Sequence, residues 1–116
     1  MEGGYDAGKR SCWLGSSYRD LLAFPEEARR QAGFQIGKIH ARLDPDDWKP
    51  FDSVGPGTRE IRIREENGIY RVMYVTKFAE ALYVLHCMQK KTQKLAPHDK
   101  LIAETRYRAI INDRKP

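Results

Sequence analysis

The chain has 116 residues, with 21 Lys and Arg against 16 Asp and Glu, which gives a formal net charge of +5. Hydrophobic residues make up 41% and charged residues 32%, a balance that excludes a disordered chain. The longest uncharged apolar run, residues 81–85, is far too short to span a membrane. We therefore expect one globular domain over residues 1–116, with residues 1–10 as a candidate disordered segment.

The location and redox state follow from the first residues and from the cysteines. Residues 1–8 have neither the basic nor the apolar region of a signal peptide, so we expect a cytoplasmic protein with no membrane partner. Cys12 and Cys87 form no C-x-x-C pair and have no histidines at zinc-site spacing, which predicts free thiols, no metal and no cofactor.

The N-terminal half reads as a strand followed by two helices. Residues 9–14 are a candidate strand, and Ser17 with Asp20 has the spacing of a capping box for a short helix. A longer helix is predicted from Pro25, with one apolar stripe at Ala28, Ala32, Ile36, Ile39 and Leu43. We interpret Gly33 and Gly37 as sites of close backbone approach, with tolerated glycines as the alternative.

A long loop and a hairpin follow. Residues 44–57 have loop chemistry throughout, and Trp48 and Phe51 are expected to pin this loop to the body. Residues 59–65 and 69–75 alternate as paired strands around Asn67-Gly68, which suits a type I′ turn. In that register Arg64 lies opposite Arg71.

The predicted hairpin has one apolar and one cationic face. Ile61, Ile63, Tyr70, Val72 and Tyr74 share the face that can pack on the long helix, and Arg62, Arg64 and Arg71 share the other. Like charges opposed on a sheet need an anion between them. That anion is either a ligand phosphate or a carboxylate of the chain, Glu60 or Glu66.

A strand over residues 81–87 and a helix from Pro97 to about Ile111 complete the chain. The order strand-helix-helix-strand-strand-strand-helix predicts the α+β class, with a small antiparallel sheet packed against the N-terminal helices on one face.

Positive charge is concentrated in the second half, where residues 58–116 hold thirteen Lys and Arg against seven Asp and Glu. The predicted strands gather Arg62, Arg64, Arg71, Lys90 and Lys91, with tyrosines nearby in sequence. Cations interleaved with aromatic rings are typical of single-stranded RNA surfaces. The alternative is an ordinary solvated surface neutralised by neighbouring glutamates. No nucleotide-binding loop, zinc motif or nucleophile elbow is present.

Several segments together resemble the phage-derived HigB-like branch of the RelE/ParE toxin superfamily. They are Trp13-Leu14-Gly15-Ser16-Ser17, Phe24-Pro25-Glu26-Glu27, Tyr70-Arg71-Val72-Met73-Tyr74, and Tyr83-Val84-Leu85-His86 with Gln89-Lys90-Lys91-Thr92-Gln93-Lys94. The resemblance implies a RelE-like fold and the toxin of a type II toxin-antitoxin pair. It further implies a metal-independent endoribonuclease that cuts mRNA in the ribosomal A site and so inhibits translation.

The same resemblance implies roles for single residues and for partners. Arg71 matches the strand arginine at the scissile phosphate, and Lys90 or Lys91 matches a second cation. Arg64 would support the phosphate, and His86 or Tyr107 would transfer protons. Arg62, Lys91 and Lys94 are expected to bind RNA. The implied partners are a helix-turn-helix antitoxin and, only through that antitoxin, operator DNA.

Two other functions are compatible with the sequence. One is non-catalytic inhibition of DNA gyrase, as in ParE-type relatives, and the other is a nucleic-acid-binding accessory protein of a phage. A lone strand histidine such as His86 is also more often a packed, hydrogen-bonded residue than a catalyst.

Overall fold

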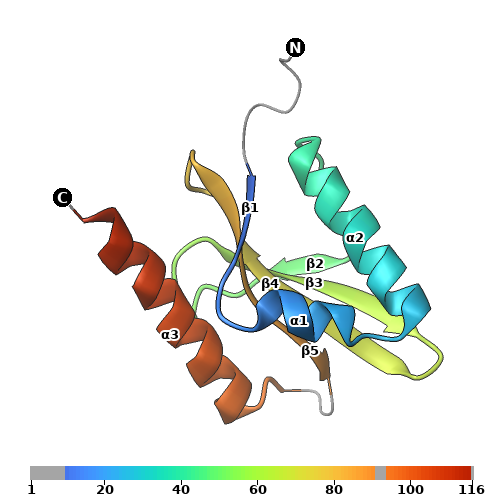
Figure 1. Cartoon of the computed structure of the whole chain (residues 1–116). Coiled ribbons are helices and arrows are strands. Elements are labelled where there is room, and N and C mark those ends of the chain that lie inside the picture. The colour runs from blue at the N-terminus through green and yellow to red at the C-terminus, as the bar shows by residue number, and fades with distance from the viewer. Residues whose placement is uncertain (1–9, 91–93, 116) are drawn as a thin grey trace.

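The computed structural model describes residues 10–90 and 94–115 (Figure 1). Within them lie five strands and three helices, in the order β1 (Arg10–Trp13), α1 (Ser17–Leu22), α2 (Glu26–His40), β2 (Trp48–Pro50), β3 (Thr58–Glu65), β4 (Gly68–Val75), β5 (Ala81–Lys90) and α3 (Pro97–Arg114). The expected α+β class and element order are confirmed, with β2 as an added strand. The predicted disorder concerns residues 1–9, which lie outside the described residues, and Arg10, which is in β1.

The strands form one sheet in the order β1-β5-β4-β3-β2. β2, β3, β4 and β5 pair antiparallel, whereas β1 pairs parallel with β5. The expectation of a purely antiparallel sheet is therefore wrong at one edge. Alternation within a strand gives its faces but not its partner, and β1 pairs with the strand farthest from it in sequence.

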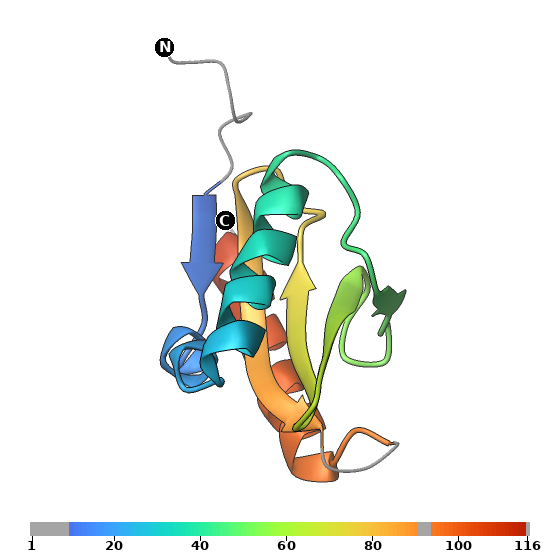
Figure 2. The same ribbon diagram turned by 90° about the vertical axis from the view of Figure 1, so that its right-hand side faces the viewer.

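Helices cover both faces of the sheet, which corrects the prediction that they cover one (Figure 2). α1 and α2 pack on the face that carries Ile61, Val72 and Val84. α3 packs on the other face, against Met73, Val75 and Leu85. The second apolar face needs its own cover, because exposing it to water would be unfavourable. No helix among the described residues is both long enough and apolar enough to cross a membrane.

The predicted apolar stripe of the long helix is confirmed at Ala28 and Ala32, which are fully buried, and at Ile36, which is 8% exposed. It is wrong at Leu43, which is 57% exposed and lies after the helix has ended at His40. The interpretation of its glycines is wrong, because a Cβ on Gly33 or Gly37 would meet nothing within 4 Å. They are tolerated glycines on the outer side of the helix.

The short helix α1 begins at Ser17 as predicted, but without a capping box. The Ser16 hydroxyl donates to Asp20 Oδ2 (2.7 Å), and the Ser17 hydroxyl donates to the carbonyl of Val84 (3.2 Å). Ser17 is thus used to fasten α1 to β5.

The hairpin register differs from the prediction by two residues. Glu65 pairs with Gly68, so that Arg62 lies opposite Arg71, and Arg64 lies opposite Ile69. Gly68 has φ +138°, which only glycine adopts readily, and the place of its missing Cβ is 2.9 Å from Nε2 of Gln89. That amide donates to the carbonyl of Asn67 (3.1 Å), so a third strand helps to set the turn. A two-residue shift preserves the faces, and the three arginines still share one.

A β-bulge interrupts the pairing of β4 and β5, because Tyr74 pairs with Val84 and Met73 pairs with His86. Leu85 is the extra residue. Its carbonyl accepts a hydrogen bond from Nη1 of Arg106 (2.8 Å), and Nη2 of the same guanidinium donates to Ser16 Oγ (3.1 Å). The bulge brings His86 to the α3 face.

Candidate functional site

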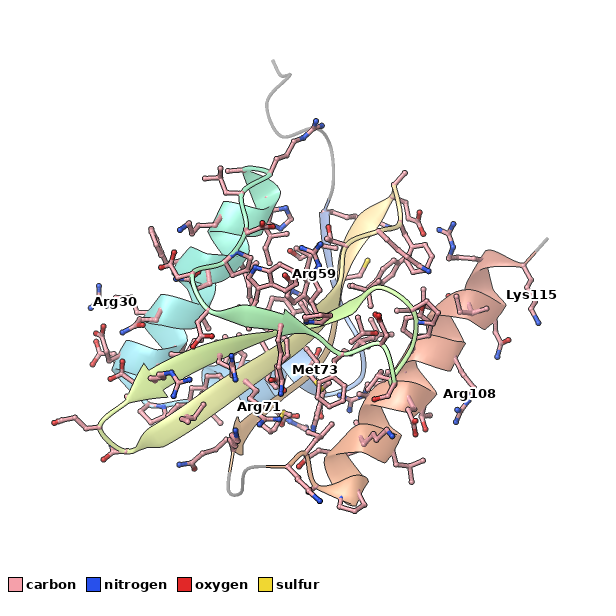
Figure 3. All side chains as sticks on the ribbon, turned by 180° about the vertical axis from the view of Figure 1, so that it is seen from behind. Arg30, Arg59, Arg71, Met73, Arg108 and Lys115 are labelled. Carbon is pink, nitrogen blue, oxygen red and sulfur yellow. The ribbon has the colours of Figure 1, made fainter. Side chains whose placement is uncertain are left out.

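Cationic side chains gather on the α3 face of the sheet, around the buried carboxylate of Glu60. Figure 3 shows Arg71 among the strands, well separated from Arg108 of α3 and from Lys115 just beyond the end of that helix. We use the name cation cluster for the four residues whose charges act on Glu60, which are Lys49 of β2, Arg62 of β3, Arg71 of β4 and Lys90 of β5. The sequence predicts three of these four as site residues, all except Lys49.

The centre of the cluster is a buried ion pair. Arg71 is 1% exposed and Glu60 is fully buried, and Nη1 of Arg71 lies 2.8 Å from Oε2 of Glu60. Burial raises the pKa of Glu60, and the charge of Arg71 is the largest influence that opposes this rise. The alternative in which Glu60 neutralises an arginine is thus realised for Arg71, which lies beneath the surface rather than on it.

The two lysines lie closer to solvent. Lys49 Nζ is 4.0 Å from Oε1 of Glu60, with 39% of its side chain exposed. Lys90 is partly buried, and desolvation, followed by the charges of Arg71 and Lys49, lowers its pKa. Burial and neighbouring positive charges both disfavour the charged form of a lysine.

Arg62 and Arg64 share a second carboxylate, that of Asp47. Arg62 Nη2 lies 3.1 Å from Asp47 Oδ1, and Arg64 Nε lies 3.2 Å from Asp47 Oδ2. Arg64 has 62% of its side chain exposed, so its pair is weakened by solvent. Arg62 is the more enclosed of the two, with 24% of its side chain exposed.

His86 faces α3 rather than the cluster's open side. Its Nε2 lies 2.7 Å from Asp99 Oδ1 in the first turn of α3, and only 7% of its side chain is exposed. Its Nδ1 is buried and has no hydrogen-bond partner among the described residues. In this arrangement His86 joins the start of α3 to the bulge of β5.

Tyr107 lies away from the cation cluster, under the loop that precedes β3. Its hydroxyl donates to the carbonyl of Pro56 (2.5 Å), and a Cβ on Gly55 would lie 2.6 Å from its ring. The ring and its hydroxyl are therefore both engaged in holding this loop against α3.

The remaining predicted RNA-binding residues flank Lys90. Lys91 lies outside the described residues. Lys94 is exposed and borders a pocket of about 70 Å³, which Arg71, Met88, Lys90 and Asp99 also line. This small hollow is where the cluster opens toward the start of α3.

Sequence reasoning missed Lys49 and Asp47 as members of the site. Both lie in the segment predicted to be loop, and Lys49 reaches the cluster because β2 pairs Lys49 with Glu60. The predicted pinning of this segment holds, since Arg59 stacks on the ring of Trp48 at 4.2 Å and Phe51 packs on the second core. A three-residue strand that follows an aspartate and ends in a proline gives no alternation from which to predict it.

The side chains at this site are suited to binding an anion. Five cations, namely Lys49, Arg62, Arg64, Arg71 and Lys90, surround two carboxylates, Glu60 and Asp47. A group with phosphate geometry would restore the balance of charge on this face. Among residues 10–90 and 94–115, no group of three or more His, Cys, Asp and Glu side chains is placed to hold a metal ion.

Comparisons with known proteins agree with the fold. The model of the phage-derived Gp49-like protein family (DUF891) matches residues 19–108. No curated protein matches the sequence. Among solved structures, a double arginine-to-alanine mutant of the E. coli toxin RelE in the free state is similar at a TM-score of 0.59 and 10% identity, over 89% of this chain and 98% of that chain.

The resemblance to the RelE superfamily that the sequence suggests is confirmed by the family match and by this likeness of fold. The matched segment includes β2, β3, β4 and β5, so it covers every residue of the cation cluster. The chain belongs to the phage-derived Gp49-like protein family and has the RelE fold.

Proposed function

We propose that this protein is the toxin of a type II toxin-antitoxin pair and cuts mRNA on the ribosome without a metal ion. The observation that carries the proposal is the excess of cations over carboxylates on the α3 face of a RelE-like sheet. The partners we propose are a helix-turn-helix antitoxin and mRNA in the ribosomal A site, with operator DNA contacted only through the antitoxin.

The reaction would be attack of an RNA 2′-hydroxyl on the adjacent phosphate. The new bond joins the 2′ oxygen to phosphorus, the bond to the 5′ oxygen breaks, and the products are a 2′,3′-cyclic phosphate and a 5′-hydroxyl. Negative charge increases on the phosphate oxygens in the transition state. Each well-placed donor to such charge contributes about 3 to 4 kcal/mol, a factor of about 100 to 1000 in rate.

Lys90 is the group we assign to the reacting phosphate. It is the cluster member with a lowered pKa, and it borders the hollow at the start of α3. Lys49 and Arg62 would bind the flanking charge. Arg71 is a positioning residue in this proposal. Its buried ion pair with Glu60 contributes to the electrostatic potential at Lys90 without contacting the RNA.

His86 and Tyr107 have no part in the proposed chemistry. Nε2 of His86 is hydrogen-bonded to Asp99, and the hydroxyl of Tyr107 donates to the carbonyl of Pro56. Proton transfer would then fall to Lys90 and to the ribosome-bound RNA itself. Alignment of the RNA by the ribosome would supply much of the rate.

The test is induction of the chain in growing bacteria, with primer extension on transcripts to locate new 5′ ends. The wild type should arrest growth and produce 5′-hydroxyl ends within codons. Lys90→Ala should reduce cleavage by about 100-fold or more. Lys115→Ala is the matched control, because Lys115 is exposed beyond the end of α3, far from the cluster (Figure 3).

A double variant, Lys49→Ala with Lys90→Ala, decides between the cluster and another site. If it folds and still cuts the same positions at the wild-type rate, the cation cluster is not the nuclease site. Arg71→Ala is unsuitable for this purpose, because it would leave the carboxylate of Glu60 buried without its partner.

A second function, inhibition of DNA gyrase by binding alone, is favoured by one observation. The three predicted arginines are paired with carboxylates of the chain, Arg71 with Glu60, and Arg62 and Arg64 with Asp47. Growth arrest without new RNA ends, together with loss of supercoiling by purified gyrase, would support this function over RNA cleavage.

A further inference from the structure

A second hollow lies on the opposite face of the sheet, at the C-terminal end of α2. Its volume is about 550 Å³, within the range of small-molecule sites. The end of α2, the loop after it and the ends of β3, β4 and β5 enclose it, and its lining includes Ile39, Leu43, Arg59, Tyr74 and Leu82. The cation cluster contributes no residue to this hollow, so a ligand here is independent of the proposed function.

The floor of this hollow contains the buried side chain of Tyr74, which is 1% exposed. Burial raises the pKa of its hydroxyl, and a hydrogen bond with the side chain of Arg59 is the largest influence that opposes the rise. The hydroxyl and Arg59 therefore lie side by side at the hollow. A tyrosine hydroxyl that accepts a hydrogen bond from an arginine can still donate its own proton to an acceptor.

Arg59 is held as a preformed anion receptor. Its guanidinium stacks on the ring of Trp48 at 4.2 Å, and its Nη1 lies 3.4 Å from Oδ1 of Asp44. The Asp44 side chain is 69% exposed, so this contact is a surface ion pair of little strength. Another carboxylate can therefore take the place of Asp44.

The rim of the hollow carries a second arginine in an unusual backbone state. Arg42 has φ +65°, and the hydrogen bonds Arg42 N to Ile39 O and Leu43 N to Lys38 O form a Schellman motif at the end of α2. Glycine is the usual residue at this position. Here the position carries a cation beside the hollow instead.

We propose that this hollow binds a carboxylate attached to an apolar group. The carboxylate replaces Asp44 beside Arg59 and accepts a hydrogen bond from the Tyr74 hydroxyl, while the apolar group lies against Ile39, Leu43 and Leu82. Two ligands have this chemistry, a free aromatic or aliphatic acid and the C-terminal residue of a peptide with an apolar side chain.

The first experiment compares 4-phenylbutyrate with its neutral amide, 4-phenylbutyramide, by NMR titration of the whole chain. The acid should give saturable shifts at Tyr74, Arg59 and Leu82, with a Kd about tenfold lower than that of the amide, as expected for a charge-assisted hydrogen bond. Equal Kd values, or no saturable shift at these residues up to millimolar acid, would overturn the proposal.

Variants that retain the fold separate binding from stability. Tyr74→Phe keeps the buried ring and Arg42→Gly places glycine at a left-handed position, so both should fold while binding the acid more weakly. Asp44→Asn should bind it more tightly, because the competing carboxylate is gone. Arg30→Ala, at the other end of α2, is the control and should bind as the wild type does (Figure 3).

A second titration, with peptides, distinguishes the source of the carboxylate. An unstructured pentapeptide that ends in phenylalanine is titrated with a free and with an amidated C-terminus. Preference for the free peptide over 4-phenylbutyrate identifies a peptide terminus as the ligand class, and the reverse preference identifies a small acid. Unchanged acid affinity in Tyr74→Phe and Asp44→Asn would contradict the assigned geometry.

Discussion

The two faces of the sheet are buried by different means. Under α2 the packed centre is apolar, with Ala32, Ile61 and Val72 fully buried. Under α3 the apolar cluster around Met73 and Leu85 gives way, on the same strands, to the buried pair of Arg71 and Glu60. Apolar burial is non-directional and tolerates modest change. A buried ion pair stabilises only while both partners are present.

The largest effect is expected from breaking the ion pair. Arg71→Met removes the charge that Glu60 faces and leaves a carboxylate buried without its nearest counterion. The free energy of unfolding should fall by about 3 to 5 kcal/mol, measured by urea denaturation. The double variant Glu60→Leu with Arg71→Met should recover much of this loss, and an Arg71→Met protein as stable as the wild type would show that the carboxyl is already neutral.

The pH dependence of stability sharpens the same point. Burial raises the pKa of Glu60 above its ordinary value of 4.5, so folding favours its protonated form. The contribution of this group to stability is therefore full below pH 4.5 and is lost as pH rises through the folded-state pKa. Glu60→Gln should remove this decline, which stability curves measured between pH 4 and 8 would reveal.

On the α2 face, neighbouring positions of one helix should respond in opposite directions. Ala32→Leu forces a larger side chain into a filled core and should lower the free energy of unfolding by about 1 to 3 kcal/mol. Gly33→Ala meets nothing within 4 Å and should raise it by up to about 1 kcal/mol. Equal effects of the two substitutions would mean that α2 does not pack on the sheet with Ala32 buried and Gly33 exposed.

The contrast between the faces explains which parts of the fold the sequence predicts. The apolar faces of α2, β3 and β4 follow from periodicity, and a register error of two residues leaves them intact because side chains alternate with period two. The parallel partner of β1, the placement of α3 and the turn at Gly68 depend on contacts between distant segments, such as Gln89 with Asn67.

Strand alternation predicts the cations of the candidate site but not their pairing. Arg62 and Arg71 follow from the alternation and Lys90 follows from the basic run after the last predicted strand, whereas the pairing of Arg62 with Asp47 depends on where β2 lies. The alternation does not predict how exposed each side chain is either. Arg71 is deeply buried and Lys90 only partly so, and a sequence pattern gives the face of a residue but not the depth to which α3 covers it.

A smaller effect is expected at the end of α2, where the apolar face meets its pocket. Arg42→Gly relieves the left-handed conformation of a residue with a Cβ, at the expense of a more flexible unfolded chain. The relief of strain should exceed the entropic cost of the added glycine, so that the free energy of unfolding rises by about 0.5 to 1 kcal/mol, measured by urea denaturation. Arg19→Gly, at an ordinary helical position in α1, should instead be destabilising.

The smallest effect is expected at an exposed ion pair, where neither face buries the charges. The hydrogen bond from Arg114, followed by smaller contributions that include Tyr83, lowers the pKa of Glu80 to about 2. The stability that this pair supplies is therefore present above pH 4.5 and lost as pH falls toward 2, the reverse of the direction at Glu60. In Arg114→Ala, NMR titration of the Glu80 carboxyl should show its midpoint moving back toward 4.5, with little change in stability at pH 7. A midpoint that stays near 2 would mean that the Tyr83 hydroxyl and the backbone, rather than the guanidinium, hold this carboxylate.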